Sequence, residues 1–168
     1  MRFVVVSNFI YDMKFKIVAV GKLKENYLRE AIAEYAKRIS RFANLEIVEV
    51  EACLSRAAQS DKEIERVKNA EGENILSKLE GYVVVMDIHG KEVSSEQFSA
   101  HIAMQKQFNS TFTFVIGGSN GLSSEVKSRA DMCCSFGKIT LPHQLFRVVL
   151  CEQLYRACCI EHNVAYHK

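Results

Sequence analysis

Short β-branched runs alternate with helical-period stretches along this chain, and that alternation limits the folds open to it. Residues 15–20 (FKIVAV), 45–50 (LEIVEV), 82–88 (YVVVMDI) and 112–116 (FTFVI) each have the composition of a strand. Between these runs, apolar residues recur three or four positions apart, as on one face of a helix. The pattern predicts an α/β fold with a mainly parallel sheet flanked by helices.

The intervals between the strands hold the expected helices. We expect helices over residues 25–41, 61–79, 123–130 and 142–162, and a further one that begins near Ser94 or Ser95. Ser123 is a suitable cap for its helix, and Pro142 suits the first turn of the last one. The tripeptide His89-Gly90-Lys91 is typical of a turn, and Gly137 interrupts an extended segment over residues 133–141.

Composition and charge exclude several classes of protein. The 168 residues are 48% hydrophobic and 25% charged, which excludes a disordered chain and suits one domain. The net charge of +2 is too small for a polybasic nucleic-acid arm, so an RNA partner must meet a local patch. Residues 13–41 hold eight Lys or Arg and three Glu, although a solvated helix face gives the same pattern. No apolar run reaches the ~18 residues of a membrane span.

The N-terminus and the cysteines indicate the cellular setting. Met13 opens MKFKIVAVGKLK like a fresh start, so we expect residues 1–12 to be an extension and residues 13–168 a single domain. The apolar stretch before it is too short for a secretory signal. The six cysteines form no CxxC pair and fit no common zinc spacing, so we expect reduced thiols, no metal and a cytoplasmic protein.

Two loops and one strand end are candidate ligand sites, because ligands of parallel sheets bind beyond the carboxyl ends of the strands. The run Gly117–Gly121 (GGSNG) follows a buried strand and precedes a helix, where glycines let the backbone approach a ligand. It is neither GxGxxG nor a P-loop, so a bare turn is an equally good interpretation. The second loop is Gly137–Gln144. The candidate strand end is Met86–Gly90, at the end of the run YVVVMDI.

The last three residues are an aromatic, an imidazole and an ammonium: Tyr166, His167 and Lys168. Chain termini usually fray. This combination of side chains, however, is suited to stacking on a base and contacting phosphate.

Five segments resemble a known family when they are taken together and in order. They are VGKLKENYL, AEYAKRIS, FVIGGSNGLSSEV, ITLPHQLFRVVLCEQLYRA and the terminal YHK. These segments resemble the ribosomal RNA large-subunit methyltransferase H family, small bacterial members of the SPOUT superfamily. The resemblance runs from Met13 to Lys168. Asn163-Val164-Ala165 departs from it, because the family more often has Gly-Glu-Pro there, and this bears on how the tail is held.

The resemblance implies a C-terminal trefoil knot and a homodimer whose interface includes the last helix. It implies S-adenosyl-L-methionine as the cofactor, with S-adenosyl-L-homocysteine as the product. The implied substrate is a pseudouridine of 23S rRNA in the assembled ribosome, methylated on N3. By position, the cofactor-binding residues are Met86, Gly117, Gly118, Gly137, Lys138, Ile139, Thr140, Leu141 and Pro142.

The N3 atom must lose its proton, fully or partly, before it attacks, so the implied chemistry needs a base that accepts this proton or a group that stabilises the resulting anion. The catalytic candidates are His143, Arg147, Tyr166, His167 and Lys168. Tyr155 and Arg156 are candidates for binding the substrate. In a dimer, one subunit's tail is expected to complete the other's site.

Two other functions stay open beside this one. One is a different SPOUT RNA methyltransferase that acts on tRNA or on a ribose hydroxyl, which the TLPHQLFR and YHK segments disfavour. The other is a non-catalytic RNA-binding module for ribosome assembly. A flavodoxin-like nucleotide-binding protein is disfavoured because no phosphate-binding loop is present.

Overall fold

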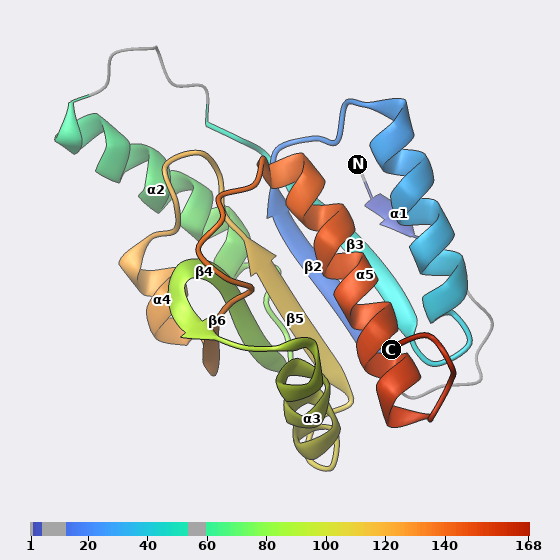
Figure 1. Ribbon diagram of the computed structural model, residues 1–168. Helices are drawn as coiled ribbons and strands as arrows, with labels where there is room; N and C mark the ends of the chain where they lie inside the picture. The colour runs from blue at the N-terminus through green and yellow to red at the C-terminus, as the bar shows by residue number, and fades with distance from the viewer. Residues whose placement is uncertain (1, 5–12, 54–59) are drawn as a thin grey trace.

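A six-stranded sheet runs through the protein, whose computed structural model describes residues 2–4, 13–53 and 60–168 (Figure 1). Its strands are β1 (Arg2–Val4), β2 (Lys14–Val20), β3 (Asn44–Val50), β4 (Tyr82–Glu92), β5 (Thr111–Ile116) and β6 (Met132–Ser135). They lie in the order β1-β3-β2-β5-β4-β6. All neighbours pair in parallel except β1, which pairs antiparallel with β3. The predicted α/β fold with a mainly parallel sheet is confirmed.

The antiparallel strand β1 lies within the predicted N-terminal extension. The sequence analysis assigned no structure to that segment, so this strand was missed. The rest of the predicted extension, residues 1 and 5–12, lies outside the described residues.

Helices cover both faces of the sheet (Figure 1). They are α1 (Asn26–Ile39), α2 (Asp61–Leu76), α3 (Ser95–Gln105), α4 (Ser124–Arg129) and α5 (His143–Glu161). The expected caps are confirmed: Ser94 forms a capping box with Gln97, and the Ser123 side chain accepts a hydrogen bond from the Val126 N–H. Pro142 stands at the N-cap position, one residue before the helical turn predicted for it.

Strand alternation divides the core into two layers. On β2, Phe15, Ile17 and Ala19 face the larger layer, which α1, α3 and α5 complete. Val18 and Val20 face the smaller layer with side chains of α2 and α4. Because both faces of β2 are covered, its sequence is nearly continuous in apolar residues, as expected for a buried parallel strand.

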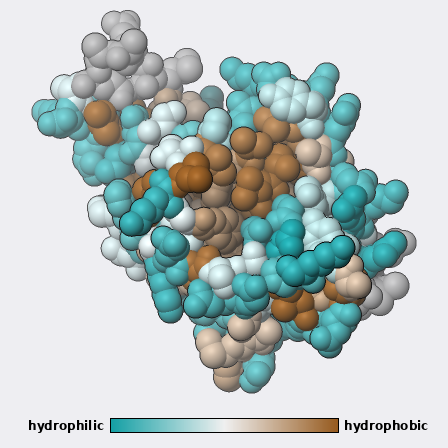
Figure 2. Space-filling view, viewed as in Figure 1, coloured by the Kyte–Doolittle hydropathy of each residue, from teal (hydrophilic) through white to brown (hydrophobic). Residues whose placement is uncertain are grey.

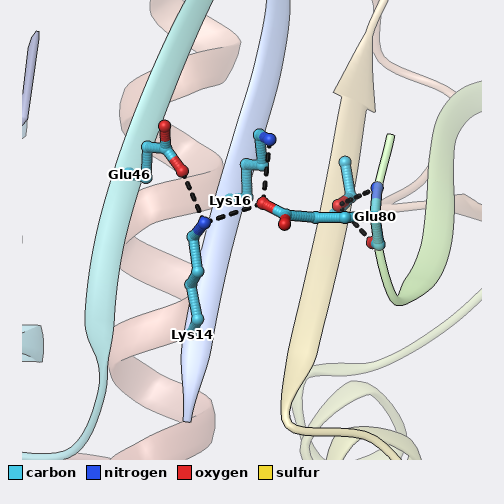
Figure 3. Close-up of polar contacts among 5 residues, drawn as sticks. Lys14, Lys16, Glu46 and Glu80 are labelled. Carbon is cyan, nitrogen blue, oxygen red and sulfur yellow. Dashed lines mark hydrogen bonds and ion pairs between the residues drawn. The ribbon is translucent and has the colours of Figure 1, made fainter. Parts of the chain in front are cut away.

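On the side of the sheet that carries Val18 and Val20, an ion-pair network replaces the valines toward the amino ends of the strands (Figure 3). The Lys14 amino group lies 2.7 Å from both Glu46 Oε2 and Glu80 Oε1, and Lys16 Nζ lies 2.8 Å from Glu80 Oε1. Hydrogen bonds from the two lysines hold the pKa of Glu80 below its usual value. Two positive charges of the basic stretch over residues 13–41, those of Lys14 and Lys16, are therefore paired within the chain. Fewer positive charges of this stretch are left to contact RNA.

The predicted turn at His89-Gly90-Lys91 is wrong, because β4 continues through it. The pairing of β4 with β6 is irregular between Met86 and Lys91, both of which lie opposite Cys134. A Cβ on Gly90 would stand 2.7 Å from the Cys133 carbonyl carbon. The glycine therefore marks a close approach between two backbones and not a chain reversal.

None of the described helices is long and apolar enough to cross a membrane. The trefoil knot that the resemblance implies stays a prediction.

Candidate active site

A cavity of about 430 Å³ opens at the carboxyl ends of β5 and β6 and beside the middle of β4. The cavity walls are Met86, which is the last residue of β4 to pair with β5, the glycine turn after β5, the loop from Phe136 to Leu141, and the first turns of α5. Figure 2 shows hydrophobic side chains gathered in the middle of this face, over the region where these elements meet in Figure 1. The two glycine-bearing loops, some twenty residues apart in the chain, thus form one pocket, as predicted.

Glycines, which have no side chain, form part of the cavity wall. A Cβ on Gly117 would stand 2.9 Å from Leu122 Cγ, so this part of the turn has no room for a side chain. Gly121 and Gly137 have φ angles of +80° and +118°, which L residues rarely adopt, and open space surrounds both positions. At its glycines, the turn therefore presents backbone to whatever enters the cavity.

Most of the predicted cofactor-binding residues line this cavity. They are Met86, Gly117, Gly118, Gly137, Ile139, Thr140 and Leu141. Lys138 and Pro142 belong to the same loop without lining the cavity. Of the predicted catalytic residues, His143 lines the cavity, whereas Arg147 and the C-terminal residues do not.

His143, Asp87 and Cys134 are the titratable side chains of the cavity wall. Partial burial, and secondarily the charge of Arg147, lower the pKa of His143, which favours the neutral imidazole. Burial alone would raise the pKa of Asp87, but hydrogen bonds from Lys127 and from the His89 N–H lower it overall. Asp87 was not singled out from the sequence, although an acid inside a buried apolar strand run, next to Met86, is a signal that could have found it.

Arg147 lies away from the cavity and bonds to other parts of the chain, and its predicted catalytic role stays a prediction. It is 1% exposed, and its Nη2 donates to the carbonyl oxygens of Val20 (2.7 Å) and Gly21 (2.8 Å). Its Nη1 pairs with Glu49 Oε1 at 3.1 Å, and that oxygen also accepts from the Leu23 N–H. Arg147 therefore ties α5 to the carboxyl ends of β2 and β3.

The C-terminal residues fold back on α5, where they form a cluster around Glu152. Glu152 Oε1 accepts hydrogen bonds from Arg156 Nε (2.9 Å), Arg156 Nη2 (2.5 Å) and the Tyr166 hydroxyl (3.0 Å). The Arg156 guanidinium lies over the Tyr166 ring at 4.7 Å. The sequence analysis singled out Arg156 and Tyr166 but missed Glu152, which binds both.

Tyr155 packs edge-on against Tyr166, with ring centroids 4.8 Å apart. Burial, followed by hydrogen bonds with Tyr35 and Glu152, raises the pKa of Tyr166. The Tyr166 hydroxyl is therefore a hydrogen-bond donor and a poor proton acceptor.

The contacts of His167 fix its tautomer. Arg156 Nη1 lies 3.1 Å from His167 Nδ1, and Arg has no acceptor, so Nδ1 accepts this bond. His167 Nε2 then donates to Glu96 Oε1 at 2.7 Å. Hydrogen bonds from Ser94, from the Glu96 backbone and from His167 lower the pKa of Glu96 to about 2. With both ring nitrogens occupied, His167 has no lone pair for a substrate proton in this arrangement.

The described residues contain no group of three or more His, Cys, Asp or Glu side chains placed to hold a metal ion. The six cysteines are free thiols in the structure. Burial raises the pKa of Cys134, Cys151 and Cys158 to about 12, which keeps these thiols protonated and unreactive.

Comparison with known proteins defines the class. Residues 13–167 match the family described as "Predicted SPOUT methyltransferase", so the chain belongs to the SPOUT methyltransferases. Proteins named "Ribosomal RNA large subunit methyltransferase H", from Streptococcus pneumoniae strains CGSP14 and JJA, are 51% identical over 160 residues. The alignment spans 93% of this chain and 100% of each relative. Within the superfamily, this methyltransferase therefore belongs with the ribosomal RNA large subunit methyltransferases H.

A solved structure agrees with the fold. A probable methylase family protein from Haemophilus influenzae Rd KW20 superposes with a TM-score of 0.50 at 10% identity. The match covers 94% of this chain and 71% of that one. At this identity, the likeness concerns the fold alone.

Proposed function

We propose that this protein transfers a methyl group from S-adenosylmethionine to N3 of a pseudouridine in 23S rRNA. The cavity between the two glycine-bearing loops carries this proposal, because it lies where parallel sheets bind ligands in a chain whose family transfers methyl groups. The name of the relatives at 51% identity supports ribosomal RNA of the large subunit as the substrate.

The residues of the cavity fit such a cofactor. Its volume of about 430 Å³ falls within the usual range for small-ligand sites. Ile116, Leu122, Phe136, Leu141 and Val149 provide apolar walls for an aromatic base, and the glycine turn provides backbone hydrogen-bonding groups. When bound, S-adenosylmethionine supplies a methyl group on a positively charged sulfur and leaves as S-adenosylhomocysteine. We assign its binding to Met86, Gly117, Gly118 and the run Gly137–Pro142.

His143 is the best placed proton acceptor. It lines the cavity, and its lowered pKa keeps the imidazole neutral near pH 7. Tyr166 holds its proton too tightly for this role, and both nitrogens of His167 are occupied. His143 therefore takes the N3 proton as the methyl group is transferred, while Tyr155, Arg156 and the tail bind the base and its phosphates.

The chain places the tail far from its own cavity. Glu152, which binds Tyr166, lies nine residues after His143 on α5, or about 14 Å along the helix axis. A homodimer that packs α5 against its counterpart would bring the tail of one subunit to the cavity of the other. We propose this composite site, with the trefoil knot at the interface.

We further propose that the protein works in the cytoplasm on the assembled ribosome. Its net charge of +2 and its partly paired basic stretch suit recognition that the folded ribosome largely supplies.

The decisive experiment is transfer of labelled methyl groups to ribosomes from a strain that lacks the gene. We expect label in 23S rRNA, and nucleoside mass spectrometry should identify it as N3-methylpseudouridine. Label in tRNA or on a ribose would show a different SPOUT methyltransferase. Calorimetry with S-adenosylmethionine tests the non-catalytic alternative, because a pure RNA-binding module should release no heat.

A further inference from the structure

A buried carboxyl group lies behind the glycine turn of the cavity. Glu71 belongs to α2, and it is 5% exposed on a helix whose other acids face solvent. Its Oε1 accepts a hydrogen bond from the Cys53 N–H at 3.0 Å. Its Oε2 has no hydrogen-bond partner among the described residues. Such an oxygen costs stability, so its position needs an explanation.

This oxygen lies against Gly118. A Cβ on Gly118 would stand 2.8 Å from Glu71 Oε2 and 3.1 Å from Val20 Cγ1. Gly118 also lines the cavity on its other side. The neighbouring Gly72 holds α2 against the start of α4, since a Cβ there would stand 2.4 Å from Ser123 Oγ. The Glu71 carboxyl is therefore held firmly between the segment after β3 and the cavity wall.

We propose that Glu71 is a positioning residue for the cofactor-binding loop: its carboxyl sets the place of Gly118, and with it the backbone that meets the ligand. This inference rests on the proposed function, because it takes the cavity to be the S-adenosylmethionine site. Glu71 does not line the cavity, so it acts through the loop and not on the reacting atoms.

The neutral carboxyl is the form that suits this position. Burial raises the pKa of Glu71 against the opposing effect of the Cys53 N–H. The Cys53 thiol lies near Glu71 in the segment after β3, and Cys53 is itself near Glu51 of that segment and Arg66 of α2. The glycine turn and Val20 contribute no titratable side chain. Glutamine reproduces the neutral acid in size and polarity, which makes Glu71→Gln the conservative variant.

The first test compares S-adenosylmethionine binding by calorimetry in Glu71→Ala, Glu71→Gln and the wild type. Glu73→Gln is the matched control, because Glu73 is an exposed acid two residues along the same helix. We expect Glu71→Ala to weaken binding about tenfold, with kcat at saturating cofactor nearly unchanged, while Glu71→Gln and the control stay within about twofold. Equal affinity of Glu71→Ala and the wild type would overturn the inference. Absence of binding by the wild type would instead overturn the proposed function.

A pH series keeps the test decisive if Glu71→Ala does not fold. Raising the pH through the elevated pKa of Glu71 ionises the buried carboxyl beside the loop, so wild-type affinity for the cofactor should fall several-fold above that pKa. Glu71→Gln should lack this fall. Identical pH profiles for the two proteins would refute the role of Glu71.

A double-mutant cycle tests the contact with Gly118 directly. Gly118→Ala places a methyl group against Glu71 Oε2 and should weaken cofactor binding. In the Glu71→Ala background the same substitution has more room, so its effect on Kd should be several-fold smaller. Additive effects would show that the carboxyl does not set the position of the loop.

Discussion

The two ends of α5 lie in different chemical environments. At the amino end, His143, Phe146 and Val149 meet glycine backbone and apolar side chains around a cavity. At the carboxyl end, the helix meets the tail in a cluster of charged and aromatic groups around Glu152. The first environment suits a small ligand, and the second suits a nucleotide and its phosphates. In the proposed composite site these two environments are the two halves, and they lie about 14 Å apart along the helix.

Two arginines, one near each end of α5, differ in the same way. Arg147 near the amino end is 1% exposed and donates to two backbone carbonyls. Arg156 near the carboxyl end is partly exposed, pairs with Glu152 and stacks on Tyr166. Nothing in the sequence separates the two, but Arg147 bonds to the strands of the sheet, whereas Arg156 bonds to Glu152 and to the C-terminal residues.

Deleting Tyr166–Lys168 should give the largest effect. We expect methyl transfer to fall by at least about 10²–10⁴-fold, because the groups that bind and orient the base are lost. Cofactor affinity should change less than about twofold, since the cavity at the other end of α5 is untouched. Calorimetry and a labelled-methyl assay measure the two quantities, and retained activity would remove the tail from the mechanism.

Arg147→Met should be the most destabilising single substitution at α5. It leaves Glu49 buried without its cationic partner, which typically costs about 3–5 kcal/mol of the free energy of unfolding. Arg156→Met is the matched control, whose more exposed ion pair should be worth under about 1 kcal/mol. Urea denaturation of both variants checks this pair, and equal midpoints would refute the assignment of Arg147 to the fold.

Glu152→Gln should lower kcat by about tenfold through the tail, because it weakens charge-assisted hydrogen bonds to Arg156 and Tyr166. Stability and cofactor affinity should stay close to wild type. Glu161→Gln, which removes a surface pair with Lys106, is the control. If both variants keep full activity, the cluster around Glu152 has no part in the reaction.

The pH–rate profile should separate the two histidines. A neutral His143 accepts the proton, so the rate should decline as the pH falls through its lowered pKa, below the usual value of about 6.5. We expect His143→Gln to lose this acidic limb and His167→Gln to keep it at a reduced rate. An unchanged limb in His143→Gln would assign proton transfer to another group.

The sequence predicted the features that depend on local pattern. The strand runs, the Ser94 and Ser123 caps and the glycine turns all follow from neighbouring residues, and strand ends located the cavity. The continuation of β4 through Gly90 was missed because it depends on a backbone contact with Cys133, more than forty residues away.

The roles of side chains on α5 could not be predicted either, because they too depend on contacts with distant parts of the chain. The carbonyl acceptors of Arg147 lie more than 120 residues before it in the chain, so periodicity could not tell it from Arg156. Glu152 and Glu71 resemble ordinary helix-surface acids until the fold places the tail and the glycine turn beside them.

Complementation between two inactive variants tests the composite site most directly. One lacks Tyr166–Lys168, and the other carries a substitution at Gly118 that blocks cofactor binding. If the tail of one subunit completes the cavity of its partner, heterodimers hold one intact site, and methyl transfer to 23S rRNA should partly return. Heterodimers that form, as judged by native mass spectrometry, yet stay inactive would contradict the composite site.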